Sequence, residues 1–459
     1  IFSMWYFFRT SLLISLFSIL FSFERGSIVS IQEIDYESHA EIQANIDNDL
    51  GTLSIDIDYG ATMYKVVYET VDGFGDSTIA SGVFAVPEGE NEAYGILSWQ
   101  HGTAIHRDGA QSNNGFDVLS RVVAASGFVY VAADYLGLGV SETVHPYILK
   151  YPTANAVIDL IRAVRNYYSE DFALSLNRQL TLIGYSEGGY ATLATQMVME
   201  QELPDEFDIT VSFPMAGPYD VSGIMVDVML ENTYYGEPFY MPYTLYSYIH
   251  YYGIGDVSDY FVPDFAVDVE DLYSGTYGGG YINSYMNNNG YNPPIACMLP
   301  DVVTEFSSDE NHILHQLLAE NDLFDWAPQS LTYLFHALGD ELVPHENSIL
   351  AYDTFIANGS EDVHIELIPE SFGGHAEAAP FAVLTAYSIG EQLQLINPKG
   401  DVTHDAMVDI TDLVFTVNII MSIVTDVDNY ALWAADFNSD AIIDILDLVN
   451  MVNYILSQP

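Results

Sequence analysis

Basic residues are scarce in this 459-residue chain, which has 10 Lys and Arg against 65 Asp and Glu and a formal net charge of −55. A charge of that sign repels the phosphates of nucleic acids and the headgroups of anionic lipids, which argues against nucleic acid as a partner. The acidic residues are scattered rather than gathered in one tail. This distribution is typical of a solvated acidic surface suited to a salty medium.

Cysteine is almost absent as well, because Cys297 is the only one and no intramolecular disulfide can form. The apolar run over residues 11–23 follows Arg9, is short for a membrane span and has the length of a secretory signal. We therefore predict that residues 1–30 are a signal peptide or an N-terminal anchor. The protein is then expected to be secreted or extracellular, or associated with the cell surface.

The composition is that of a globular protein, since hydrophobic residues make up 49% and aromatic residues 14% of the chain. Up to about residue 60 the sequence is acidic and weakly patterned. Two β-rich runs around a turn-rich segment then predict a hairpin, and after it strand-like runs alternate with helical ones. This alternation predicts the α/β class, a mostly parallel sheet flanked by helices. The hairpin runs are 63–70 and 78–87, the later strand-like runs are 95–100, 128–133, 179–184, 209–214, 331–338 and 363–369, and the helical runs are 116–125, 153–168, 187–200, 346–357 and 377–393.

Between about residues 221 and 329 the alternation stops, and the chain becomes rich in Tyr, Gly, Asn and Met. We predict that this segment is an insertion that caps the sheet. Aromatic side chains with polar tips suit the wall of a cleft, and they also suit ordinary packing within a cap. Both interpretations of the tyrosines remain open.

A serine in a glycine-rich turn carries the strongest chemical signal. An apolar strand is followed by Gly184-Tyr185-Ser186-Glu187-Gly188-Gly189, which opens a helix, and this is the context of a nucleophile elbow. Glycines at 184 and 188 allow the tight turn that presents the serine hydroxyl at the edge of the sheet. Ser186 is therefore the predicted nucleophile.

A serine hydroxyl needs a base to take its proton, and the base needs an acid to hold its tautomer. In this architecture the acid and the histidine follow the serine in chain order, in loops after late strands. Asp340 follows the strand-like run 331–338, and His375 follows the run 363–369, so we predict Asp340 as the acid and His375 as the base. The alternatives are Glu341 or Asp322 as the acid and His345 as the base, whereas four other histidines are expected to be packed or solvated: His312, His315, His336 and His364.

The oxyanion of an acyl-transfer intermediate needs two N–H donors, one from the residue after the nucleophile and one from the loop after an early strand. Glu187 and Thr103 are the predicted donors. Gly102 would let that loop approach the substrate closely, and His101 is expected to brace the loop rather than to react.

Together these motifs resemble the secretory lipase branch of the α/β hydrolases over about residues 63–393. The matching segments are Val67-Tyr68-Glu69-Thr70, Ala80-Ser81-Gly82-Val83, His101-Gly102-Thr103, Ala133-Asp134-Tyr135-Leu136-Gly137-Leu138-Gly139, His145-Pro146-Tyr147 and the serine turn. The resemblance implies an ester or lipid substrate, an acyl-enzyme on Ser186, a triad completed by Asp340 and His375, no cofactor for catalysis, and a loop near the cleft braced by Asp134. The chain lacks the cysteines that fungal members of the family use for disulfides.

Residues 401–412 recur almost position for position at 436–447, which makes two copies of one unit. The repeat resembles a type I dockerin, whose EF-hand-like loops bind calcium through oxygen ligands. The resemblance implies two structural calcium sites and a cohesin-like or cell-surface partner. The implied ligands are Asp401, Thr403, Asp405, Asp409 and Asp412 in the first loop, and Asp436, Asn438, Asp440, Asp444 and Asp447 in the second.

Two positions depart from the dockerin pattern. The usual glycine at the sixth loop position is Ala406 or Ala441, and an alanine held at positive φ costs about 1 kcal/mol. The tenth and eleventh positions, where Ser or Thr commonly serves cohesin recognition, hold Ile410-Thr411 and Ile445-Leu446, which puts cohesin binding in doubt.

The predicted organisation is a signal or anchor at 1–30, an α/β-hydrolase domain at 31–397 with its cap at 221–329, and an all-α calcium module at 398–459. The predicted function is hydrolysis of carboxylic esters. A serine peptidase of the prolyl oligopeptidase type and a non-catalytic binding protein are the alternatives. The peptidases carry a large β-propeller before the catalytic domain, whereas about 60 residues precede the first core-like strands here, and a binding protein would be free to lose a triad member.

Overall fold

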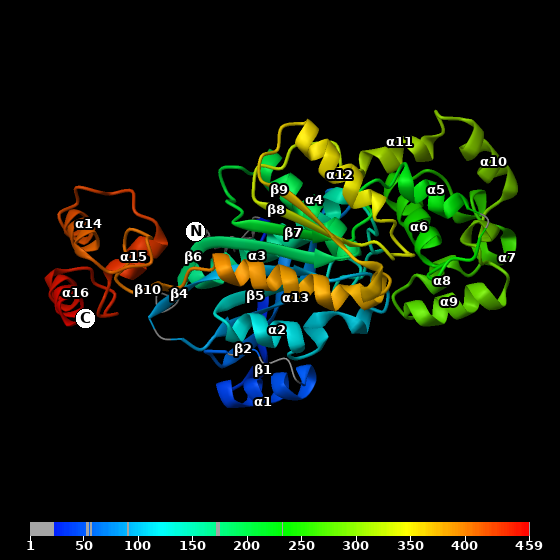
Figure 1. The fold of residues 1–459 in the computed structure, drawn as a ribbon. Coiled ribbons are helices and arrows are strands. Elements are labelled where there is room, and N and C mark those ends of the chain that lie inside the picture. The colour runs from blue at the N-terminus through cyan, green and yellow to red at the C-terminus, as the bar shows by residue number, and fades with distance from the viewer. Residues whose placement is uncertain are drawn as a thin grey trace, which may run out of the picture.

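The computed structural model describes residues 23–51, 55, 57–89, 91–170, 175–231 and 233–458. Its centre is a sheet of ten strands in the order β1-β2-β3-β5-β4-β6-β7-β8-β9, with β10 beside β4 (Figure 1). Strands β1, β2 and β3 pair antiparallel, and β4 to β9 run parallel. The strands are β1 (Ile28–Glu37), β2 (Ala61–Val71), β3 (Ser77–Pro87), β4 (Glu92–Gln100), β5 (Phe128–Ala133), β6 (Ser175–Tyr185), β7 (Val211–Met215), β8 (Thr332–Ala337), β9 (Val363–Ile368) and β10 (Asn397–Pro398).

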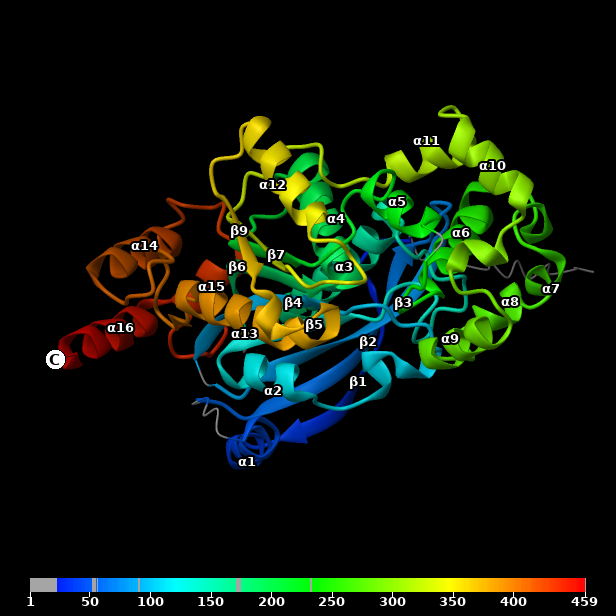
Figure 2. The ribbon, with the colours of Figure 1, turned by 45° about the vertical axis from the view of Figure 1, so that its right-hand side comes forward.

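Helices cover both faces of this sheet, which is why its central strands are buried along their whole length (Figure 2). One face packs against α1 (His39–Leu50), α2 (Val118–Ala125) and α13 (His375–Leu393). The other face packs against α3 (Lys150–Glu170), α4 (Glu187–Glu202) and α12 (Glu346–Ala357). The predicted alternation of strands and helices is confirmed from the hairpin β2-β3 onward.

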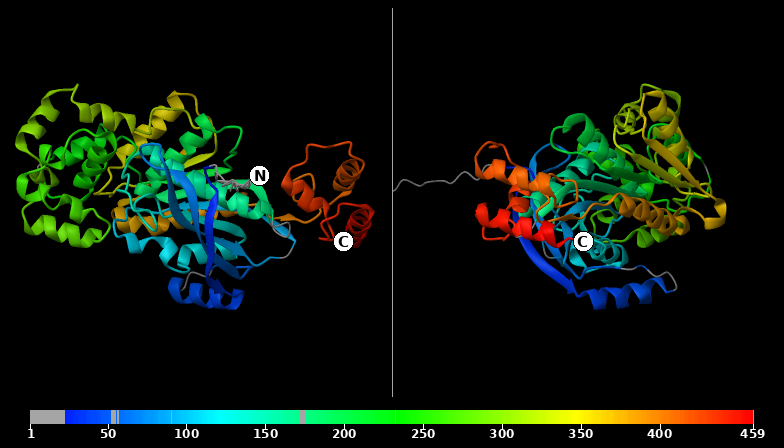
Figure 3. Two further views of the ribbon diagram at one scale, coloured as in Figure 1. Left: turned by 180° about the vertical axis from the view of Figure 1, so that it is seen from behind. Right: turned by 60° about the vertical axis from the view of Figure 1, so that its left-hand side comes forward.

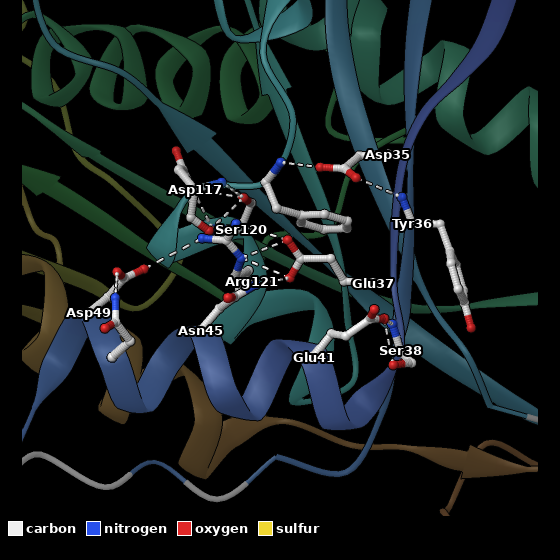
Figure 4. Close-up of polar contacts among 12 residues, drawn as sticks. Asp35, Tyr36, Glu37, Ser38, Glu41, Asn45, Asp49, Asp117, Ser120 and Arg121 are labelled. Atoms are coloured by element: carbon white, nitrogen blue, oxygen red, sulfur yellow. Dashed lines mark hydrogen bonds and ion pairs between the residues drawn. The ribbon is translucent and has the colours of Figure 1, made fainter.

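The stretch before residue 60 is more regular than its sequence pattern suggested, because it forms β1 and α1. Strand β1 begins at Ile28, so the predicted boundary at residue 30 falls inside it, while residues 1–22 of that predicted segment lie outside the described residues. A charged contact fixes this segment on α2 (Figure 4). The Arg121 guanidinium donates to both oxygens of Glu37 at 2.9 Å and lies 3.6 Å from Asp49 of α1. One of the few basic residues thus joins β1, α1 and α2.

The predicted insertion is a helical cap beside one end of the sheet (Figures 1 and 2). Most of its buried side chains belong to the same apolar core as α3 and α4, so the cap is continuous with the body of the protein. Tyr147, Tyr243 and Tyr273 stack in sequence, with ring centroids 4.5 and 4.9 Å apart. The helices are α5 (Ile224–Leu230), α6 (Tyr240–Tyr252), α7 (Pro263–Ala266), α8 (Val269–Leu272), α9 (Gly279–Asn288), α10 (Pro300–Ser308) and α11 (Ile313–Glu320).

The C-terminal residues form a small helical unit, which lies at the end of the sheet opposite the cap (Figures 1 and 3). It contains α14 (Ile410–Ile420), α15 (Asn429–Ala435) and α16 (Ile445–Ser457), whose apolar side chains form a separate core that also includes Ala93 of β4. Polar contacts join it to the sheet, because β10 pairs with β4 and Arg178 of β6 lies 2.5 Å from Asp428. Among the described residues, no helix has the length and apolar character needed to cross a membrane.

Candidate active site

Ser186 lies in the tight turn between β6 and α4, where the sequence predicted a nucleophile elbow. Its backbone has φ of 65° and ψ of −124°, a strained conformation for a residue with a side chain. The two glycines make the turn possible by close approach. A Cβ at Gly184 would run into the carbonyl of Gly188, and a Cβ at Gly188 would run into the carbonyl of Gln100.

Three side chains form a hydrogen-bonded chain that begins at this serine. The Ser186 Oγ lies 2.8 Å from Nε2 of His375, and Nδ1 of His375 lies 2.6 Å from Oδ2 of Asp340. A carboxylate only accepts hydrogen bonds, so Nδ1 carries the proton and Nε2 is free to accept from the serine. The structure therefore brings together the three residues that the sequence nominated. One detail differs, since His375 is the first residue of α13 rather than part of a loop.

The side chain of Asp340 is fully buried and is surrounded by donors. Its Oδ1 accepts from the backbone N–H groups of Leu342 and Val343, at 3.0 and 2.8 Å. Burial acts to raise the pKa of Asp340, but hydrogen bonds from His336 and His375 lower the pKa by more, so it lies well below its usual range. The carboxylate therefore stays charged and holds the ring of His375 in one tautomer.

His336 is a contact that the sequence did not reveal. It lies in β8, fully buried as expected of a strand histidine, but its Nε2 is 3.2 Å from Oδ2 of Asp340 and 2.8 Å from the carbonyl of Val343. Because the carbonyl only accepts, Nε2 carries a proton that it shares with the carboxylate. The spacing of His336 and Asp340, four residues across the end of a strand, was the available signal.

The alternative acids and base lie elsewhere. Glu341 accepts from the backbone N–H of His375 at 3.1 Å, so it holds the start of α13 and not the ring. Asp322 accepts from the backbone and the hydroxyl of Ser222. His345 lies 3.7 Å from Glu346.

The predicted oxyanion donors lie on two sides of the nucleophile. Glu187 is the first residue of α4, where backbone N–H groups have no acceptor within the helix. A Cβ on Gly102 would lie 3.7 Å from Cβ of Ser186, which places the loop of Thr103 beside the serine. The Thr103 hydroxyl is 2.9 Å from that of Tyr147. His101 braces the loop as expected, since its ring stacks on Tyr135 at 4.2 Å.

Asp134 also fits the expected bracing role. Its buried carboxylate accepts from the hydroxyl of Ser81 at 2.6 Å and from the backbone N–H of Ser112 at 3.0 Å. These bonds tie the loop after β5 to β3 and to the segment that follows the loop of Thr103.

A cleft opens at Ser186 and is lined by residues of the cap. Its wall is mainly aliphatic and methionine-rich, with tyrosines near the serine, and both sides of the cap contribute to it. Tyr235 of the cap does not line the cleft, and its hydroxyl donates to the carbonyl of Leu342, which follows β8. The apolar lining includes Met225, Met229, Met241, Leu245, Phe306 and Leu314.

Comparisons with known proteins agree with this geometry. Residues 114–258 match the model of the prolyl oligopeptidase family, while no curated protein matches the chain. The rice cell wall degrading esterase LipA from Xanthomonas oryzae is 27% identical, with a TM-score of 0.69 over 80% of this chain and 96% of that one. A Legionella pneumophila protein described as a hydrolase is 25% identical, with a TM-score of 0.72 over 80% of this chain and 98% of that one. Candida antarctica lipase A is 15% identical, with a TM-score of 0.58 over 81% and 82%, and shows the fold alone.

The chain has an esterase- and lipase-like α/β-hydrolase fold. Residues 92–398, from β4 to β10, hold the serine, the histidine and the aspartate on this fold. The C-terminal unit contains the residues that the sequence nominated as calcium ligands.

The two C-terminal loops have the same backbone arrangement. In the first, N–H groups of Asp405 and Ala406 donate to Asp401, and those of Thr403 and Asp409 donate to Asp412. The second repeats all four bonds at Asp440, Ala441, Asn438 and Asp444. Ala406 and Ala441 adopt φ of 63° and 64°, the positive values expected at the sixth position.

The nominated ligands converge most clearly in the first loop. Carboxylate oxygens of Asp401, Asp405 and Asp412 lie within 4.8 Å of one another, a spacing and donor type that fit a calcium ion. Burial and the charge of Asp401 raise the pKa of Asp412. Thr403 donates its hydroxyl to Asp412, while Asp409 and Asp444 accept from backbone N–H groups that begin α14 and α16. In the second loop the Asn438 amide donates to Asp440.

Proposed function

We propose that the protein is a carboxylic ester hydrolase that works through an acyl-enzyme on Ser186. The observation that carries this proposal is the unbroken chain of hydrogen bonds from Ser186 through His375 to Asp340. The likeness to the esterase LipA over most of both chains supports the choice of ester chemistry.

The geometry allows each proton to be followed. Ser186 Oγ attacks the carbonyl carbon of the ester as its proton passes to Nε2 of His375. The resulting oxyanion accepts hydrogen bonds from the main chain at Glu187 and Thr103. The C–O bond then breaks, and the leaving alcohol takes the proton from His375. A water molecule repeats the sequence at the acyl-enzyme, which releases the carboxylic acid and restores the serine.

The cleft indicates what the acyl or alcohol part of the ester resembles. Its wall beneath the cap is dominated by Met, Leu, Val and Phe side chains, and burial of each CH₂ group stabilises a bound chain by about 0.8 kcal/mol. An ester with an apolar hydrocarbon portion fits this wall better than a fully polar one. We therefore place lipid-like esters within the substrate class.

The match to the prolyl oligopeptidase family keeps a serine peptidase as the second candidate. Both activities use the same three side chains, so the substrate decides between them. Purified protein assayed with p-nitrophenyl esters of graded chain length and with peptide amides distinguishes the two. We expect turnover of the esters and none of the amides.

Substitution of the nucleophile tests the mechanism itself. Ser186→Ala should lower ester turnover by about 10⁶-fold, because no alternative nucleophile lies on His375. Its melting temperature should not fall, because the substitution removes only the hydroxyl and keeps the backbone hydrogen bond from residue 186 to the carbonyl of Met215. Ester turnover that survives the substitution would overturn the proposal, and turnover of amides alone would favour the peptidase.

We further propose that the C-terminal unit binds structural calcium and tethers a secreted enzyme to a cohesin-like or cell-surface partner. The convergence of three carboxylates in the first loop supports the calcium sites. Exposed apolar side chains on α14 and α16 support a tether, because such surfaces mark contacts between proteins. They include Ile410, Val414, Ile445, Leu446, Val449 and Leu456.

A further inference from the structure

A buried histidine and a buried glutamate face each other beside the nucleophile, and the reaction steps above use neither side chain. Nε2 of His145 lies 2.7 Å from Oε1 of Glu187, and the two side chains are 3% and 1% exposed. Glu187 follows Ser186 directly and lines the same cleft. His145 comes from the segment between β5 and α3, so the contact joins two parts of the chain at the reaction centre.

The hydrogen bonds fix how many protons the pair holds. Nδ1 of His145 lies 2.7 Å from the carbonyl oxygen of Leu136, which can only accept, so Nδ1 carries a proton. The short contact between Nε2 and Oε1 then requires one further proton, on one atom or the other. The pair is either imidazolium with carboxylate or imidazole with carboxylic acid, and its net charge is zero in both forms.

Within the described part of the chain, His145 is the only proton-bearing partner of the Glu187 carboxylate. The ion pair with His145 is the one formed by this carboxylate, and its Oε2 is buried without a hydrogen-bond partner. The titratable groups that face it from neighbouring elements are the phenols of Tyr135, Tyr147, Tyr240 and Tyr243, which bring no positive charge. The neutrality of Glu187 therefore depends on His145.

A lone carboxylate at this position would oppose catalysis. Negative charge develops on the substrate oxygen in the transition state, and a buried like charge beside it is screened weakly. We propose that His145 is a positioning residue that neutralises Glu187, so that the main-chain N–H of Glu187 can stabilise the oxyanion without opposition from its own side chain. This inference rests on the proposed ester hydrolysis.

A pair of variants separates this role from simple packing. His145→Phe keeps an aromatic ring among Tyr135, Tyr147 and Tyr243 but leaves the glutamate without its proton-bearing partner. We expect kcat for a p-nitrophenyl ester to fall about 100-fold while KM changes less than about threefold, because the charge acts on the transition state. The double variant His145→Phe/Glu187→Met removes the charge as well and should recover at least about tenfold in kcat.

Loss of kcat in the double variant equal to that in His145→Phe would overturn the proposal, because packing alone would then explain the pair. Unchanged kcat in His145→Phe would also overturn it. If His145→Phe does not fold, His145→Gln offers an amide donor but no charge and should show the same loss. Ser186→Ala in the same series identifies serine-dependent turnover in the unaltered protein. If the unaltered protein shows no serine-dependent turnover, ester hydrolysis is rejected. If it does show such turnover but kcat does not respond to substitution of His145, this inference alone is rejected.

Discussion

The active site and the first C-terminal loop both contain buried aspartate side chains, but only the active-site aspartate faces histidine rings. Asp340 receives hydrogen bonds from two histidines and two backbone N–H groups, and its pKa is lowered. Asp401 and Asp412 are equally buried, yet they lie against each other and the pKa of Asp412 is raised. No Lys or Arg forms an ion pair with either of these two within the described residues.

The two regions therefore differ in the donors that face the buried carboxylate, which at Asp340 include the ring nitrogens of His336 and His375. At Asp340 the partner is built into the fold, because catalysis needs a proton that moves between fixed groups. In the loop, the calcium ion that we propose would take this part, and its stabilising effect grows with the logarithm of its concentration.

The largest expected effect is on kcat, when the active-site carboxylate of Asp340 is replaced. Asp340→Asn should lower kcat about 10⁴-fold, because an amide cannot hold the proton on Nδ1 of His375 and Nε2 no longer accepts from Ser186. Ester turnover measured against Glu341→Gln provides the matched control on the neighbouring acid. A greater loss in Glu341→Gln would show that the acid has been assigned to the wrong residue.

The aspartates of the C-terminal loops are tested by removing calcium with EDTA and then adding it back. In the full-length protein, millimolar calcium should stabilise the C-terminal unit by about 3–4 kcal/mol relative to EDTA, if the ion is present at about 100 to 1,000 times its Kd. Differential scanning calorimetry should show this as a shift of one transition. Asp401→Asn should abolish the shift, and the exposed Asp426→Asn should retain it. Identical melting curves in calcium and EDTA would exclude metal sites.

Asp322 offers a smaller, intermediate case. Its carboxylate accepts hydrogen bonds from the backbone N–H and the hydroxyl of Ser222, where the two ends of the cap meet. Burial raises the pKa of Asp322 to about 6. Between about pH 4 and pH 6 the folded state holds a proton that the unfolded state has released, so rising pH lowers the free energy of unfolding by up to about 2–3 kcal/mol. Asp322→Asn should flatten this dependence.

Urea unfolding at pH 4.5 and pH 7 measures the effect of Asp322→Asn. The exposed Asp264→Asn serves as the control and should keep the slope of the unaltered protein. A slope that is the same in all three proteins would mean that Asp322 titrates alike in the folded and unfolded states.

The sequence predicted those parts of the molecule in which local pattern and global position agree. The serine turn, Asp340 and His375 each follow an apolar strand, and the order of elements alone places them at one edge of the sheet. The first strand was missed because β1 is largely exposed and carries no alternation of apolar residues. The partnership of His336 with Asp340, and that of His145 with Glu187, depends on tertiary packing that a single sequence does not display.

The attachment of the C-terminal unit beside β4 has a consequence for how the enzyme would meet its substrate. Asn397 joins the two parts, since its amide donates to Asp401 and accepts from Asn177 at the start of β6. Ser186 stands at the other end of that strand, and the eleven residues of β6 span about 36 Å. In a molecule held by its C-terminal helices, Ser186 therefore lies at the end of β6 away from the attachment. Under the proposed tether, attachment to a partner and the proposed reaction at Ser186 use opposite ends of the same strand.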